Sequence, residues 1–287
     1  MSDPASADGS AAIDAVADRI RAAIGDRRPR VGVVLGSGLG GLADRLENVV
    51  ALPYADLPGF PRSTAAGHAG RFVVGALPGV DHPIIAMQGR FHLYEGWNAR
   101  QAALPVWVMR RLGVECVVVS NAAGGLNPQY RVGDVVAIDD HINFMFRNPL
   151  VGPNDESLGP RFPDMSSPYD PRLIAVAHEA ARSHGFPLHT GVYVAMLGPT
   201  YETRAEYRMT RTLGGDVVGM STVPEVVAAV HAGMRVFGVS TVTNADPPDA
   251  LGETTHDEVV EAAASAGEKL RHLVEALVRH VSGAEAP

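Results

Sequence analysis

Residues 31–41 read VGVVLGSGLGG, a short apolar run that passes directly into a glycine-rich turn. A run of this length bounded by glycine is typical of a strand buried on both faces of a sheet. Comparable runs recur along the chain, at residues 72–75, 83–87, 115–120, 134–138, 191–197, 216–219 and 236–242. Helical periodicity lies between several of them, at residues 11–26, 99–112, 171–184, 203–213, 223–232 and 255–281. This alternation predicts an α/β fold whose sheet is at least partly parallel and carries helices on both faces.

The composition favours one domain without a membrane or nucleic-acid partner. The 287 residues contain no linker or internal repeat, so we expect a disordered tail at 1–10 and a single domain at 11–287. The first residues lack the features of a secretory signal, and no apolar run reaches the ~18–20 residues of a membrane span, which favours a cytoplasmic protein. A net charge of −8 without a basic block argues against a nucleic-acid surface. The only cysteine, Cys116, lies in an apolar run and is expected to be an inert core residue.

Two long stretches carry no helix or strand pattern, 147–170 with its five prolines and 245–253. Structureless loops of this length are uncommon in compact domains and are often lids or contacts between subunits. A surface loop without function is the alternative for the first of them.

The glycine-rich turn formally matches the dinucleotide fingerprint G-x-G-x-x-G, from Gly36 to Gly41. A dinucleotide fold also needs an acidic residue about 20 positions later, at the end of a second strand. The nearest candidate, Asp56, lies in a stretch with loop character. The glycines would still let the backbone approach a ligand closely, and the start of a helix there would favour an anion, to which Ser37 could add a hydroxyl. A tight turn without a ligand is the alternative.

A second group of polar residues follows the predicted strand at 83–87. Arg90, His92 and Tyr94 alternate, so in an extended segment they share one face. A guanidinium, an imidazole and a phenol on one face suit an oxyanion beside a sugar, although an exposed polar edge is equally open. His68, in a glycine-flanked loop, is a further candidate donor, and a lone loop histidine is more often incidental.

Further candidates stand at strand ends and helix starts. Small residues, 121–125, follow the predicted strand at 115–120, and open α/β sheets bind ligands outside such carboxyl ends. Another predicted strand ends at Asn244. Three patterns of the type T-x-x-E predict capping boxes, at Thr203–Glu206, Thr222–Glu225 and Thr255–Glu258. The residues beside these helix starts are Tyr201, Glu202, Met220, Ser221 and His256. They could converge on one pocket, or the caps could be purely structural.

Metal and nucleophile patterns are poor. His178-Glu179 lacks the second histidine of a zinc-protease helix. Asp139-Asp140-His141 could bind a cation, but an exposed acidic turn is the better interpretation. The sequence therefore predicts no metal site.

Taken together, these segments resemble the trimeric purine nucleoside phosphorylases that act on 6-oxopurine nucleosides. The resemblance rests on an ordered series of motifs: GSGLGGL (36–42), GHAG (67–70), MQGRFHLYEG (87–96), NAAGGLNP (121–128), GPNDE (152–156), GPTYETRAE (198–206), VGMSTVPE (218–225), TN (243–244) and HDEV (256–259). It implies a single α/β domain with a mixed central sheet, a homotrimer with sites at subunit interfaces, and phosphorolysis of purine nucleosides without a metal or organic cofactor.

The resemblance also implies a role for each matching position. Phosphate would be held by Ser37, His68, Arg90, His92, the backbone of Ala122, and Ser221. The ribose would lie among Tyr94, Met220 and His256, and the purine among Tyr201, Glu202 and Asn244. Asn244, Glu202 and His92 would carry the catalysis.

Substrate choice follows from the amide of Asn244, which offers both a donor and an acceptor and so suits a 6-oxopurine. We therefore expect cleavage of inosine and guanosine rather than adenosine. Three departures from the family pattern leave the substrate range open: Leu158 in place of a phenylalanine that reaches the neighbouring subunit's site, Tyr201 in place of a phenylalanine, and an unusually acidic and proline-rich loop at 245–253. A shift of that loop could bring Asp246 into the pocket. The alternatives are a methylthioadenosine phosphorylase, an NAD-dependent dehydrogenase and a non-catalytic nucleoside-binding protein.

Overall fold

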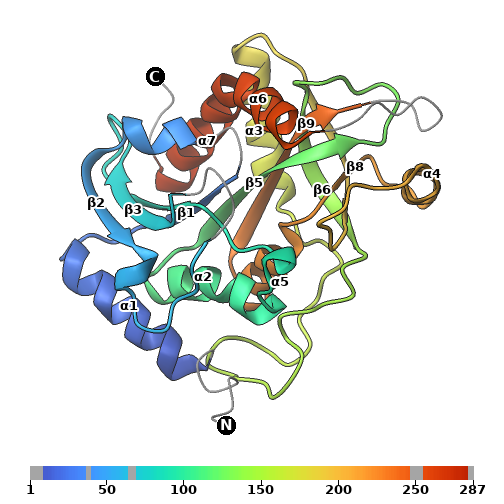
Figure 1. Ribbon diagram of the computed structural model, residues 1–287. Coiled ribbons are helices and arrows are strands. Elements are labelled where there is room, and N and C mark those ends of the chain that lie inside the picture. Colours follow the sequence, from blue (N-terminus) through green and yellow to red (C-terminus); the bar gives the residue numbers. More distant parts are fainter. Residues whose placement is uncertain (1–8, 37–39, 64–68, 246–254, 284–287) are drawn as a thin grey trace.

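The computed structural model describes residues 9–36, 40–63, 69–245 and 255–283 and consists of one mixed sheet between two layers of helices (Figure 1). Its strands are β1 (Val31–Leu35), β2 (Glu47–Pro53), β3 (Arg71–Ala76), β4 (Ile84–Gln88), β5 (Cys116–Gly125), β6 (Val135–Asn143), β7 (Leu188–Ala195), β8 (Val217–Gly219) and β9 (Arg235–Asn244). The predicted α/β class is confirmed, with parallel and antiparallel pairs in the same sheet.

The strand order is β2-β3-β4-β1-β5-β8-β7-β6-β9, and β9 also pairs with β5. The second half of the sheet therefore closes on itself, because β5, β8, β7, β6 and β9 form a ring of hydrogen-bonded neighbours. The long strand β5 belongs to both halves. It pairs in parallel with β1 and β9 and antiparallel with β8.

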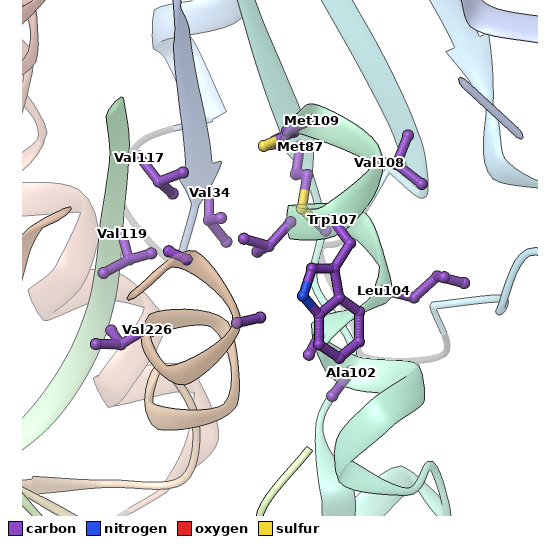
Figure 2. Packing of buried hydrophobic residues seen from close by; sticks show 14 of the residues in the cluster. Val34, Met87, Ala102, Leu104, Trp107, Val108, Met109, Val117, Val119 and Val226 are labelled. Carbon is purple, nitrogen blue, oxygen red and sulfur yellow. The ribbon is translucent and has the colours of Figure 1, made fainter. Parts of the chain in front are cut away.

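Helices cover both faces of this sheet (Figure 1). The described α-helices are α1 (Ser10–Ile24), α2 (Ala99–Arg111), α3 (Pro171–Ser183), α4 (Arg204–Thr212), α5 (Val223–His231), α6 (His256–Ser265) and α7 (Gly267–Ser282). One core cluster joins α1, α2 and α5 to one face, and a second joins α3 and α7 to the other. In the first, Trp107 of α2 is fully buried and lies near Met87 of β4 and valines of β1, β5 and α5 (Figure 2).

The main differences from the sequence-based expectation concern exposed or interrupted elements. Strand β2 was not predicted, although residues 49–52 (VVAL) are apolar; it is an edge strand that pairs with β3, and most of its side chains are exposed. The single helix expected at 255–281 is two helices, with a break at Ala266. Residues 147–170 contain no helix or strand, as predicted.

Two further expectations from composition can be compared with the structure. Cys116 is fully buried in β5, and burial raises the pKa of its thiol to about 12, as expected of an inert core residue. No helix in the described parts of the chain is long and apolar enough to cross a membrane.

Candidate active site

The site begins with an open edge of strand β5. On one side of this strand β9 pairs with residues 116–124, whereas on the other side β1 pairs only as far as Val119 and β8 begins at Gly124. The edge between those two pairings, within the described residues, faces a pocket. The carbonyl of Ala122 points toward Gly219 of β8, so its N–H points to the same edge, since both groups of a strand residue face one neighbour. The fold thus directs a backbone donor into the pocket.

The pocket collects residues from widely separated parts of the chain. Its lining consists of Gly36, Arg90, His92, Tyr94, Asn121, Ala122, Ala123, Gly124, Tyr201, Glu202, Val218, Gly219, Met220, Ser221, Thr243, Asn244 and Val259. Every residue to which the resemblance assigned a role with phosphate, ribose or purine, and whose side chain the structure describes, is among them. Ser37, His68 and Asp246 lie outside the described residues. His256 is the first residue of α6, and its side chain also lies outside the described part.

Arg90 provides the buried positive charge of the pocket. It follows β4, and its side chain is only 2% exposed. Its Nε donates to Glu225 Oε1 (2.9 Å), and its Nη1 donates to the carbonyl of Ser120 (2.7 Å) and to Ser221 Oγ (3.2 Å). A buried guanidinium held by a carboxylate and two further acceptors is well placed to take a phosphate oxyanion.

The turn that carries Ser221 corrects one sequence prediction. Thr222 was expected to cap α5 together with Glu225, but its φ of 74° is in the left-handed region and its side chain makes no cap hydrogen bond. Such a backbone costs about 1–3 kcal/mol in a β-branched residue and persists only where the surroundings hold it. Here Asn121 Nδ2 donates to Thr222 Oγ1 (2.9 Å), and the N–H of Ser221 donates to Tyr193 Oη (3.2 Å). The other two predicted capping boxes are confirmed at Thr203 and Thr255.

His92 and Tyr94 extend the polar wall beyond Arg90. They belong to the short 3-10 turn η4 (Leu93–Glu95) and its start, and their rings stack with centroids 4.6 Å apart. The Nδ1 of His92 lies 3.0 Å from Glu95 Oε1, and that carboxylate is 3% exposed. This contact with the Glu95 carboxylate fixes the orientation of the imidazole, and His92 lines the pocket.

The other end of the pocket is suited to a planar heterocycle. Tyr201 and Glu202 precede α4, and burial raises the pKa of the Glu202 carboxyl. Asn244 ends β9, and its amide lies against Gly124 of β5: a Cβ built there would meet both amide atoms at 3.3 Å. An amide and a carboxylate on one side, with an aromatic ring nearby, can pair with the edge of a purine.

The dinucleotide interpretation of the glycine turn is wrong. The turn leads into a six-residue 3-10 helix, η2 (Gly40–Arg45), and the next strand, β2, pairs only with β3, antiparallel, in the described sheet. Asp56 lies in another 3-10 turn, η3 (Tyr54–Asp56), rather than at a strand end. Gly36 is still required, because a Cβ there would lie 2.3 Å from the carbonyl oxygen of Ser120.

The acidic stretch 139–141 is not a turn but part of strand β6, with a bulge between Ile138 and Asp140. His141 Nδ1 lies 3.1 Å from Tyr169 Oη, and burial lowers the pKa of that histidine. Among the described residues no group of three or more His, Cys, Asp or Glu side chains is arranged to hold a metal ion.

Sequence reasoning missed several residues of the site. Val218, Thr243 and Val259 line the pocket, and Glu225 stands behind Arg90. Thr243 could have been found from its place beside Asn244 at a strand end. Glu225 could not, because its pattern in the sequence is that of an ordinary helix cap.

The geometry defines a class of protein: a single-domain α/β protein in which one end of a pocket is suited to an anion and the other to a planar heterocycle. The sequence pattern of the phosphorylase superfamily matches residues 30–279. Purine nucleoside phosphorylase 1 of Bacillus subtilis is 53% identical over 250 residues, which cover 87% of this chain and 92% of that protein. The chain belongs to this superfamily, as a member of its purine nucleoside phosphorylase family.

Solved structures agree with this assignment. Schistosoma mansoni purine nucleoside phosphorylase in complex with inosine is 41% identical and superposes with a TM-score of 0.89, covering 94% of this chain and 96% of that one. A structure of the Schistosoma mansoni enzyme in complex with adenosine is 42% identical with a TM-score of 0.88, covering 94% and 97%.

Proposed function

We propose that this chain is an enzyme, a pentosyltransferase, that cleaves purine ribonucleosides and deoxyribonucleosides with inorganic phosphate. The products are the free purine and the sugar 1-phosphate. The observation that carries the proposal is the juxtaposition, in one pocket, of the buried Arg90 and Ser221 with Glu202 and Asn244. This arrangement supports a phosphate anion beside the sugar of a bound nucleoside.

Phosphate is assigned to the end formed by the open β5 edge. Its ligands in this proposal are Ser37, His68, Arg90, His92, the N–H of Ala122, and Ser221. The described members of this set include a guanidinium, a backbone donor and two side chains whose own partners orient them. Phosphate is a co-substrate here, and the proposed reaction uses no metal ion or organic cofactor.

The nucleoside is assigned to the rest of the pocket. Tyr94, Met220 and His256 surround the ribose, and Tyr201, Glu202 and Asn244 take the purine. When the bond between C1′ and N9 breaks, its electron pair leaves with the purine and C1′ becomes oxocarbenium-like. A phosphate oxygen then forms the new bond to C1′. Asn244 donates to N7 as negative charge develops on the base, and one such donor is typically worth roughly 3–4 kcal/mol.

The proposed substrates are chiefly inosine and guanosine. The amide of Asn244 can donate to N7 and face a 6-oxo group, and Glu202 can accept from N1–H. Schistosoma mansoni purine nucleoside phosphorylase has been solved in complex with inosine and in complex with adenosine. Turnover is therefore the property to compare.

The test is base release from inosine, guanosine, adenosine and methylthioadenosine, each with and without phosphate. We expect inosine and guanosine to be cleaved only when phosphate is present. Cleavage mainly of methylthioadenosine would keep the reaction and reject the assignment of specificity. If no nucleoside is cleaved with phosphate, the proposed activity fails and a nucleoside-binding protein takes its place.

The proposal extends to a homotrimer that acts in purine salvage in the cytoplasm. The homotrimer is supported by three large apolar side chains that are exposed near or within the loop at 147–170 and could be buried between subunits: Phe146 and Val151 are 77% exposed and Phe162 is 87% exposed. Leu158 does not protrude from this loop, because it is 8% exposed and packs in the core of its own chain. Light scattering after size exclusion is expected to give three times the mass of the 30.2 kDa chain.

A further inference from the structure

Glu225 is a buried carboxylate that the proposed reaction does not use directly. It lies in the first turn of α5, and its side chain is 2% exposed. The turn before it leaves no capping role for this residue, because Thr222 has a left-handed backbone and makes no cap hydrogen bond. Its carboxylate instead accepts from Nε of Arg90, which lies 135 residues away in the sequence.

The contact with Glu225 determines how the guanidinium of Arg90 is oriented. Nε and the two Nη atoms lie in one rigid plane, so a bond at Nε together with a bond at Nη1 fixes the position of the whole group. The bond at Nη1 runs to the carbonyl of Ser120, in the strand whose open edge faces the pocket, and to Ser221 Oγ. Glu225 is thus the charged member of a three-point support behind the anion end of the pocket.

Glu225 also offsets the cost of the buried charge. A guanidinium as buried as that of Arg90 needs a counter-charge, because burial disfavours an unpaired ion. A bound phosphate could balance this charge only while the pocket is occupied. Glu225 provides it in the free protein and so keeps Arg90 in one place before phosphate arrives.

We propose that Glu225 is a positioning residue for phosphate: it acts through Arg90 by holding the guanidinium at the orientation in which it receives the oxyanion. This inference rests on the proposed phosphorolysis. It assigns to Glu225 an effect on phosphate recognition and no contact with the nucleoside.

Two substitutions separate geometry from charge. Glu225→Asp keeps the negative charge but is one methylene shorter, so its carboxylate no longer reaches Nε at the same position. Glu225→Gln keeps the length and an acceptor oxygen but removes the charge. We expect Glu225→Asp to raise the KM for phosphate about tenfold, the effect of one misplaced charge-assisted hydrogen bond. We expect a rise of about the same size in Glu225→Gln, because that variant leaves the buried guanidinium of Arg90 without its counter-charge. The KM for inosine should stay within about twofold in both, because Glu225 reaches the substrate only through Arg90.

Val226→Ala is the matched control, since Val226 is the next residue of α5 and is fully buried in the core. It should lower the Tm without changing the KM for phosphate. An unchanged KM for phosphate in Glu225→Asp overturns the inference, and so does an equal rise in the KM for inosine. If Glu225→Asp does not fold, Glu225→Gln decides: a tenfold rise in the KM for phosphate there supports the inference, and an unchanged KM for phosphate overturns it. Phosphate-dependent cleavage by the wild type tests the proposed function separately, so a failure of either can be told from a failure of the other.

Discussion

Gly36→Ala tests the close approach between β1 and β5 on which the site is built. The added Cβ would lie 2.3 Å from the carbonyl oxygen of Ser120, 2.9 Å from its carbonyl carbon and 3.1 Å from Cα of Asn121. All three are backbone atoms of a paired strand and cannot rotate away as a side chain would. The two strands must separate, and overpacking of this kind typically costs about 1–3 kcal/mol. For a chain of this size the Tm should fall by roughly 2–5 °C.

The same displacement reaches the anion end of the pocket. The carbonyl of Ser120 accepts from Arg90 Nη1 at 2.7 Å, so moving it weakens one of the bonds that hold the guanidinium. A loss of about 1.4 kcal/mol there corresponds to a tenfold higher KM for phosphate. Steady-state kinetics with phosphate and inosine varied in turn, together with thermal unfolding, measure both effects.

Gly32→Ala is the control in the same strand. Its Cβ would meet Met109 Sδ at 2.5 Å, and the flexible methionine side chain can move away. We expect a smaller loss of stability and an unchanged KM for phosphate. The reasoning is refuted if Gly36→Ala leaves both the Tm and the KM for phosphate as they are in the wild type, or if Gly32→Ala raises that KM as much.

Three more outcomes follow from the purine end. Asn244→Asp removes the donor to N7 and should lower kcat/KM for inosine about 100-fold or more while sparing adenosine, and an equal loss for both nucleosides would contradict the assigned specificity. Burial raises the pKa of the Glu202 carboxyl, so as the pH falls this group is protonated earlier than an ordinary glutamate, and the KM for inosine should rise in mildly acidic solution. Glu202→Gln should abolish this pH dependence; if the pH dependence persists in that variant, it belongs to another group. Gly124→Ala should displace the amide of Asn244, which lies 3.3 Å from the new Cβ, and should raise the KM for inosine several-fold. Gly9→Ala is the control, because a Cβ there has no neighbour within 4 Å, and equal kinetics in both variants would show that the contact with Asn244 is unimportant.

Buried and locally determined elements could be predicted from the sequence. The strand at 31–35 is an apolar run that ends in glycine, and the structure has β1 at that place. The caps at Thr203 and Thr255 were also predicted correctly, since both partners of a capping box lie within one turn. Strand β2 was missed although residues 49–52 are apolar: it is an exposed edge strand, and what holds it is its pairing with β3 rather than burial of that run.

The residue types of the site could be read from the sequence, but their arrangement could not. Arg90, His92 and Tyr94 were grouped correctly because they are neighbours along the chain. The partner of Arg90 was assigned instead to a helix cap, since the pattern at Thr222 and Glu225 is the same as in a true capping box. Only the tertiary structure shows that the cap does not form: Thr222 has a left-handed backbone, and its Oγ1 accepts from Asn121 Nδ2.

The sequence alone therefore determined the α/β class, most of the elements and the chemistry available to the pocket, because these depend on short-range pattern and on residue type. The tertiary structure decided which groups meet. It closed half of the sheet into a ring, opened the edge of β5 between β1 and β8, and paired Arg90 with a glutamate 135 residues away. These features depend on contacts between segments that are distant in the sequence. Such contacts contribute free energy only in the folded chain, so no local sequence pattern predicts them.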